Sequence, residues 1–197
     1  MSRTAAIDRK TSETDISIKL ILDSIEPSVI NSGVSFFDHM LKSMSRHGRF
    51  HLKLTCKGDV HIDDHHSVED IGICLGKAFK EALGDKAGIK RFGNSIIPMD
   101  ESLTMVAIDI SGRPFFKYSG TELKGNVKSY SEELTLEFLR AFSDNSGINL
   151  HVVQKYGDNR HHIHESIFKA LGVALNSAVS IDPSIKGEIP STKGMIE

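Results

Sequence analysis

The sequence predicts an α+β fold of two similar, duplicated halves, each a sheet with helices on one face, packed as one unit. The first observation is a histidine pair followed by a glutamate, which occurs twice: His65-His66 with Glu69, and His161-His162 with Glu165. The two copies lie 96 positions apart (161 − 65 and 165 − 69), and the apolar residues that follow repeat at the same offset. Because a repeat this short rarely buries its own core, we expect the halves to pack together.

Strands are predicted from side-chain alternation in both halves. Apolar and polar residues alternate, as in half-buried strands, at 16–22 and 50–56 and again at 96–97, 105–110 and 148–152. We expect residues 9–14 to be a polar stretch before the first of these strands. Val60 and Ile62 are expected to begin a further strand that leads to Asp63.

Helices are predicted where apolar residues recur at a spacing of three and four. This spacing is found at 36–44, 65–83, 134–142 and from 161 onward, with Gly48 and Gly84 placed to end the first two helices. The resulting order of elements suggests a first half at 1–90, a second half at 91–180 and a C-terminal tail at 181–197. Such tails are usually disordered, but the hydroxyls and the ammonium of Ser191, Thr192 and Lys193 can also bind a phosphate.

Composition limits the classes of partner. The chain has 24 basic and 26 acidic side chains, a net charge of −2, so nothing indicates a nucleic-acid or membrane-surface partner. The two cysteines, Cys56 and Cys74, lie in apolar segments and form no disulfide framework, which favours a reducing compartment. No stretch has the pattern of a signal peptide or a membrane span. We therefore expect a cytoplasmic protein.

The histidine pairs have the residue types of a metal site. On a helix, His65 and His66 lie four and three residues before Glu69, so each can share a face with that carboxylate. The two imidazoles diverge by roughly 100° around the helix, which suits two different ions better than one. Nitrogen and carboxylate donors without a thiol favour Mn, Fe, Zn or Ni. A single pair could equally cap a helix or face solvent, but the second copy in register argues against that interpretation.

Long motifs make the chain similar to a known family, imidazoleglycerol-phosphate dehydratase. The resemblance covers nearly the whole chain and rests on residues 37–41, 63–72, 98–101, 109–114 and 161–165, with the ending at 190–194. It implies the two-half fold and a closed homo-oligomeric cage of about 24 subunits, with active sites shared between subunits. It also implies a small phosphorylated substrate, and neither nucleic-acid nor membrane partners.

The resemblance implies a cofactor of two Mn²⁺ ions per subunit. The implied ligands, matched by position, are His39, His65, His66, Glu69, Glu137, His161, His162 and Glu165. Many family members carry a histidine where this chain has Glu137, and a carboxylate can serve as an oxygen ligand in its place. His151 is an outside candidate. Taken alone, His39 beside an apolar helix face would more commonly be a packing or surface residue.

The resemblance also implies the substrate and the reaction. The implied substrate-contacting residues are Glu13, His47, Arg91, Arg113, Lys169, Ser191 and Lys193. The reaction is the dehydration of imidazole glycerol phosphate to imidazole acetol phosphate in histidine biosynthesis, catalysed by a carbon–oxygen lyase. No carbonyl acidifies the C–H bond that must break, so a metal-stabilised imidazolate is the expected electron sink. Glu13, Glu69 or Glu165 would move the protons.

Two other classes of protein use similar residues. A dinuclear metallohydrolase needs a bridging carboxylate and ions about 3.5–4 Å apart, whereas adjacent histidines that diverge favour separated ions. A non-enzymatic metal-binding or storage protein would need neither Arg113 nor the tail residues.

Overall fold

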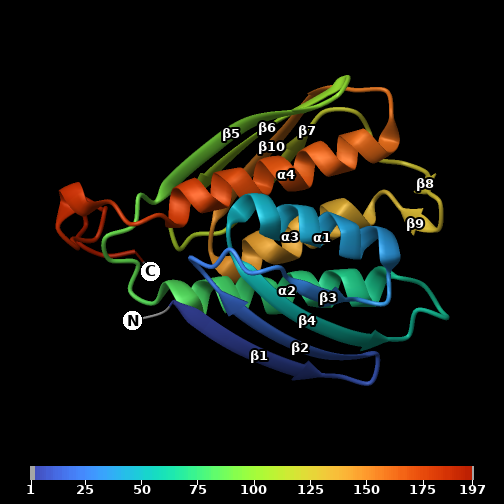
Figure 1. The fold of residues 1–197 in the computed structure, drawn as a ribbon, viewed down its shortest axis with the longest axis horizontal. Coiled ribbons are helices and arrows are strands. Elements are labelled where there is room, and N and C mark those ends of the chain that lie inside the picture. Colours follow the sequence, from blue (N-terminus) through green and yellow to red (C-terminus); the bar gives the residue numbers. More distant parts are fainter. Residues whose placement is uncertain (1–2, 197) are drawn as a thin grey trace.

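Two four-stranded sheets enclose a layer of four long helices in the computed structural model of this protein, which describes residues 3–196 (Figure 1). Each sheet has its helices on one face only, and its other face points outward. Apolar side chains from both sheets and all four helices form one continuous core. The predicted fold class, an α+β protein with helices on one face of each sheet and both halves packed as one unit, is therefore confirmed.

The first half contains four strands and two helices. They are β1 (Thr4–Lys10), β2 (Thr14–Ile21), β3 (Val29–Asn31), α1 (Ser35–Gly48), β4 (His51–Gly58) and α2 (His65–Leu83). The strand order across the sheet is β1-β2-β4-β3, with β3 parallel to β4 and the other neighbours antiparallel. Alternation along β2 and β4 buries every second side chain, as predicted.

The second half repeats this order. Its elements are β5 (Phe92–Met99), β6 (Ser102–Asp109), β7 (Phe115–Ser119), α3 (Leu134–Ser146), β10 (Asn149–Tyr156) and α4 (Arg160–Val179). The sheet order β5-β6-β10-β7 matches that of the first half, including one parallel neighbour pair, β7 with β10. A small hairpin of β8 (Asn126–Val127) and β9 (Tyr130–Ser131) is added before α3, and a short 3-10 helix, Pro183–Ile185, lies in the tail.

Two local predictions were wrong, and one strand was not predicted. Residues 60–62 form a turn, in which the Ile62 amide donates to the Asp59 carbonyl at 2.7 Å, and no strand begins there. The side chains of Val60 and Ile62 are 43% and 66% exposed, so no sheet face buries them. The expected polar stretch includes the end of strand β1, an edge strand whose alternation is masked by charged residues. The three-residue strand β3 was not predicted.

The halves are joined by two close helix crossings. Helix α1 of the first half packs against α4 of the second, and α2 packs against α3. A Cβ atom at Gly172 would lie 2.4 Å from the Met44 carbonyl oxygen, and one at Gly76 would lie 2.7 Å from that of Phe142. These glycines are 96 positions apart (172 − 76), the offset of the repeat, so each copy of the repeated sequence contains the glycine that permits the close crossing. Each crossing brings a histidine-pair helix against the first helix of the other half.

All four helices begin at the same end of the molecule, and the first and last described residues lie at the opposite end (Figure 1). None of the helices within residues 3–196 has the length and apolarity needed to cross a bilayer. Cys56 and Cys74 are both buried free thiols, which agrees with the prediction that they form no disulfide framework.

Replacing Gly172 with alanine should destabilise the fold by about 1–3 kcal/mol, because α1 must move away from α4. The loss should appear even though alanine favours a helix over glycine by about 1 kcal/mol. Denaturant unfolding of Gly172→Ala measures the effect, with Asn176→Ala on the same helix as the control. An unchanged midpoint in Gly172→Ala would contradict the close crossing.

Candidate active site

Three donor groups converge where α1 crosses α4. The ligand atoms of His39, His161 and Glu165 all lie within 4.8 Å of one another, and within residues 3–196 no other three His, Cys, Asp or Glu side chains are grouped so closely. The Glu165 Oε2 atom is 3.3 Å from His161 Nε2 and 3.7 Å from His39 Nε2. His39 comes from the first half and the other two from the second, so the helix crossing builds the group.

The donor set and its charge suit a divalent cation. Two imidazole nitrogens and one carboxylate oxygen, without a thiolate, match the preferences of Mn²⁺ and Zn²⁺. Burial raises the pKa of Glu165, but the hydrogen bond and charge of Lys169, with His39 and His161, outweigh it and leave that pKa below its ordinary value. Lys169 Nζ lies 2.9 Å from Glu165 Oε1, so the ionised carboxylate keeps its other oxygen for the histidines.

The equivalent crossing of α2 with α3 holds a less complete group. His65 Nε2 lies 3.7 Å from Glu69 Oε2, as in the predicted four-residue pairing. Glu137 occupies the position on α3 that His39 occupies on α1 (137 − 39 gives 98, the offset of the flanking helix residues). It is half-buried, on the helix that packs against α2, but it does not close a group of three with His65 and Glu69.

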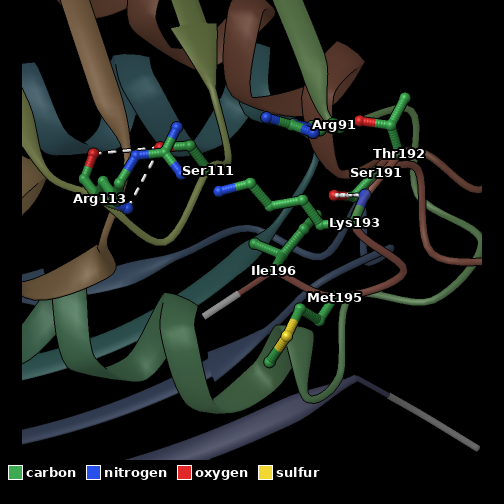
Figure 2. A pocket seen from close by; sticks show the side chains of 8 residues that line it. All are labelled: Arg91, Ser111, Arg113, Ser191, Thr192, Lys193, Met195 and Ile196. Carbon is green, nitrogen blue, oxygen red and sulfur yellow. Dashed lines mark hydrogen bonds between the residues drawn. The ribbon is translucent and has the colours of Figure 1, made fainter.

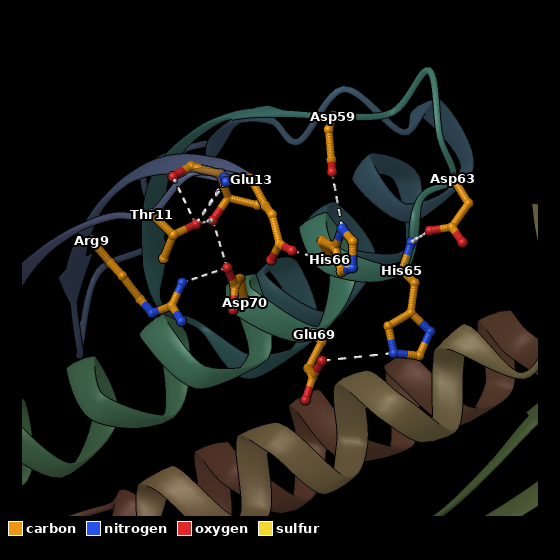
Figure 3. A network of polar contacts seen from close by, with 10 residues as sticks. Arg9, Thr11, Glu13, Asp59, Asp63, His65, His66, Glu69 and Asp70 are labelled. Carbon is orange, nitrogen blue, oxygen red and sulfur yellow. Dashed lines mark hydrogen bonds and ion pairs between the residues drawn. The ribbon is translucent and has the colours of Figure 1, made fainter.

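The second histidine of each pair points elsewhere. The ring planes within each pair meet at 81°, with centroids 6.3 Å apart for the first pair and 6.2 Å for the second. His66 faces Asp59 at 3.0 Å and Glu13 at 3.9 Å (Figure 3), rather than Glu69. The expected divergence of the adjacent imidazoles is therefore present; the assignment of each to a different ion stays a prediction.

His162 is held by two residues of the β5–β6 turn. Its Nδ1 lies 2.7 Å from Glu101 Oε2, and its Nε2 lies 3.7 Å from Asp100 Oδ2. The hydrogen bond to His162 and those from backbone amides lower the pKa of Glu101 to about 2. The same bond raises the pKa of His162, as the bond to Asp59 raises that of His66.

The hairpin that carries Glu13 is fastened to α2. Asp70, 7% exposed, accepts a hydrogen bond from Thr14 Oγ1 at 2.5 Å and is ion-paired with Arg9 of β1 (Figure 3). Thr11 in turn accepts from the Glu13 amide at 3.1 Å. These contacts fix the β1–β2 turn so that the exposed Glu13 side chain lies beside His66.

His47 and His151 are not members of the group formed by His39, His161 and Glu165. His47, near the end of α1, lines an open cavity of about 940 Å³ together with Arg49 and Val173. Its pKa is lowered by burial and by the positive charge of Lys169. His151 is on the outward face of β10, with its ring centroid 5.6 Å from that of Phe115, so it joins no donor group.

Cationic and hydroxyl side chains line a second pocket, of about 230 Å³ (Figure 2). Its polar lining comes from Arg91, Ser111, Arg113, Ser191, Thr192 and Lys193. Within residues 3–196, the Arg113 guanidinium and the Lys193 ammonium have no hydrogen-bond or ion-pair partner, which leaves two cations for an anion. The tail thus lies where its hydroxyls and ammonium meet both arginines.

Arg91 fastens the tail to the second sheet. Its Nε and Nη2 atoms donate to Asp109 at 2.7 and 3.2 Å, and its Nη1 donates to the Pro190 carbonyl at 2.9 Å. Lys86, only 6% exposed, donates to the Ile196 carbonyl at 3.1 Å. The tail within the described residues is therefore held by specific contacts.

The anion pocket and the donor group lie at opposite ends of α4. The Arg91 amide donates to the carbonyl of Ala178 at 3.0 Å, in the last turn of the helix, whereas His161 and Glu165 are in its first two turns. A helix of this length spans about 30 Å. A small molecule cannot contact both sites of one chain at once.

Sequence reasoning gave no role to three acidic residues that contact His66 and His162, the outer histidine of each pair. They are Asp59, Asp100 and Glu101. Asp100 and Glu101 belong to the motif at 98–101, one of those that carry the family resemblance. Their place in that motif is the sequence signal that could have identified them. Asp59 follows strand β4 and had no comparable signal.

Together, these features define a duplicated α+β protein with nitrogen-and-carboxylate donor groups and a separate anion pocket. The family model for imidazoleglycerol-phosphate dehydratase matches residues 32–175. Proteins of that name from Moorella thermoacetica and a Geobacillus species are 53% and 50% identical to this chain, over all of both chains. The crystal structure of the Staphylococcus aureus enzyme superposes with a TM-score of 0.82 at 37% identity, covering 91% of this chain and 99% of that one. A Pyrococcus furiosus structure gives 0.82 at 33% identity, covering 96% and 99%.

The chain belongs to the imidazoleglycerol-phosphate dehydratase family. It is accordingly an enzyme, a hydro-lyase of histidine biosynthesis.

Replacing Arg91 with alanine should release the tail from the sheet. Because a hydrogen bond from a charged donor is worth about 1.5 kcal/mol or more, trypsin should cleave after Lys193 roughly tenfold faster than in the unchanged protein. Lys90→Ala, which removes a neighbouring cation without a contact to Pro190, is the matched control. Equal cleavage rates in Arg91→Ala and the unchanged protein would contradict this anchoring role.

Proposed function

We propose that this enzyme binds two Mn²⁺ ions per subunit and uses them to convert imidazole glycerol phosphate to imidazole acetol phosphate. The observation that carries the proposal is the convergence of His39, His161 and Glu165, two imidazoles and an ionised carboxylate on two different helices. The buried free thiols remain reduced in the cytoplasm, where we place the reaction.

Eight side chains would hold the two ions: six at the two helix crossings, and two, His66 and His162, that face away from them. They are His39, His65, His66, Glu69, Glu137, His161, His162 and Glu165. At the crossing of α2 with α3, Glu137 offers an oxygen in the position where His39 offers a nitrogen at the crossing of α1 with α4. This difference between the two crossings still leaves a donor set of imidazoles and carboxylates, which suits Mn²⁺.

Each protein group has a task that follows from its environment. When bound, Mn²⁺ supplies positive charge that stabilises the substrate ring after loss of its N–H proton. Glu13 is the best placed carboxylate to move a proton, because its side chain has no hydrogen bond within residues 3–196 and reaches to 3.9 Å from His66. Such general acid–base help is worth about 10²–10⁴-fold in rate. Glu165 is less suited, since Lys169 holds one of its oxygens.

Glu69 lies beside His65 as a ligand and is a second possible proton carrier. His47 and Lys169, which lie near one another on neighbouring helices, are the further substrate contacts we propose on the histidine side of the site.

The substrate phosphate would bind in the anion pocket. Arg113 offers a forked, bidentate donor, Lys193 a point charge, and Ser191 a hydroxyl, with Arg91 holding the tail in place. Because this pocket and the donor group of the same chain lie at opposite ends of a helix about 30 Å long, we propose that two subunits bind one substrate. We therefore propose a site shared between subunits of a closed homo-oligomer of about 24 copies.

The two rival functions fit the geometry less well. A dinuclear hydrolase requires ions about 3.5–4 Å apart on a bridging carboxylate, but the members of each histidine pair turn to different carboxylates. A storage protein has no use for an anion pocket with two cations that have no partner within residues 3–196.

The test is an assay with imidazole glycerol phosphate on protein stripped of metal and then given Mn²⁺. We expect no turnover after chelation at low pH, which protonates the imidazoles and weakens metal binding, and recovery of a ketone product when Mn²⁺ is restored. Elemental analysis must confirm that the stripped sample is metal-free. Full activity in that sample would contradict the proposed metal dependence, and release of free phosphate would indicate a hydrolase instead.

A further inference from the structure

We propose that Asp59 and Glu101 are positioning residues, which orient the outer histidines His66 and His162 so that each presents its Nε2 atom to a metal ion. The inference rests on the metal binding proposed above. It adds two side chains that are not themselves among the proposed ligands. It also assigns different tasks to the two equivalent turns of the duplicated halves.

In the first half, Asp59 contacts one nitrogen of His66 and leaves the other open. Both Asp59 carboxylate oxygens lie near His66 Nδ1, at 3.2 and 3.0 Å (Figure 3). An ionised carboxylate only accepts hydrogen bonds, so Nδ1 carries the hydrogen. The lone pair of the neutral ring is then on Nε2, the atom that faces Glu13. Metal-binding histidines typically donate their second N–H to a carboxylate in this way.

In the second half, Glu101 performs the same task from a different loop. Its Oε2 accepts from His162 Nδ1 at 2.7 Å. Its Oε1 accepts from the Asp158 and Asn159 amides at 3.3 and 2.8 Å. Asn159 is the N-cap of α4, and its side chain accepts from the His161 and His162 amides. Glu101 therefore ties the imidazole to the start of its own helix.

The two turns have diverged since the duplication. Glu101 directly precedes the buried first residue of β6, Ser102, as Glu13 directly precedes that of β2, Thr14. Glu101 is held by an imidazole and two amides, whereas Glu13 lies 3.9 Å from its histidine, on the open Nε2 side. Asp59 explains the difference, because it already occupies Nδ1 of His66. One turn glutamate is thereby freed to act on substrate, and its counterpart is used for positioning.

The degree of burial is sufficient for these contacts to matter. The side chains of Asp59 and His66 are 14% and 35% exposed, and those of Glu101 and His162 are 38% and 23% exposed. Partly desolvated carboxylate–imidazole pairs are screened less than fully exposed ones.

The experiment is a titration of metal-free full-length variants with Mn²⁺ alone, following the free ion by electron paramagnetic resonance. We expect Asp59→Ala and Glu101→Ala each to weaken one class of Mn²⁺ site by about 10–100-fold. Asp59→Asn and Glu101→Gln, whose amide oxygens can still accept the Nδ1 hydrogen, should recover most of that affinity. Glu122→Gln, which removes a surface carboxylate whose one ion-pair partner among the described residues is Lys124, is the control and should bind like the unchanged protein.

Unchanged Mn²⁺ affinity in both alanine variants would overturn the proposal. So would amide variants that bind no better than the alanine variants, because orientation through an acceptor would then not be the cause. Circular dichroism of the metal-free variants separates positioning from unfolding, and loss of the folded signal in both amide variants would also overturn it. If the unchanged protein itself bound no Mn²⁺, the proposed function would fail instead. Titration of the unchanged protein with Mn²⁺ distinguishes the two outcomes.

Discussion

The close crossing of helices from opposite halves is the constraint on which the rest of the structure depends. Gly172 and Gly76 let the backbones of two helices approach until a methyl group would not fit between them. That approach places His39 of one half against His161 and Glu165 of the other. A single half could supply a histidine pair and a glutamate, but not the third donor. The packing of the two halves and the composition of the donor group therefore both depend on this crossing.

The common direction of the four helices has a second consequence. Because all of them begin at one end, both histidine pairs lie there, and the anion pocket formed by the tail lies at the other (Figure 1). A chain arranged in this way has both parts of a site but cannot bring them together itself. Under the proposed function, further copies would supply the missing part, and oligomerisation would then be a requirement for catalysis.

Much of the fold could be predicted from the sequence, because alternation and helical spacing report directly on which face is buried. The strands around Ile18 and Leu54 and the helix after His65 followed from that pattern. The strand that includes Arg9 was missed because charges on an edge strand hide its alternation, and Val60 was misassigned because two apolar residues in a turn resemble a strand. In the site, spacing predicted that adjacent histidines diverge. It could not predict the approach of α1 to α4, which depends on distances between segments far apart in the chain, nor the contact of Asp59 with His66, which depends on the conformation of a turn.

Complementation between two inactive variants tests the shared site most directly. Arg113→Ala removes a cation from the anion pocket, and His161→Ala removes a donor from the histidine group at the other end of the chain. When the two are dissociated, mixed and reassembled with Mn²⁺, random pairing should give intact hybrid sites and restore up to about a quarter of the unchanged enzyme's activity. A mixture in which both variants are present in the same particles, but which stays as inactive as either alone, would contradict a site built from two subunits.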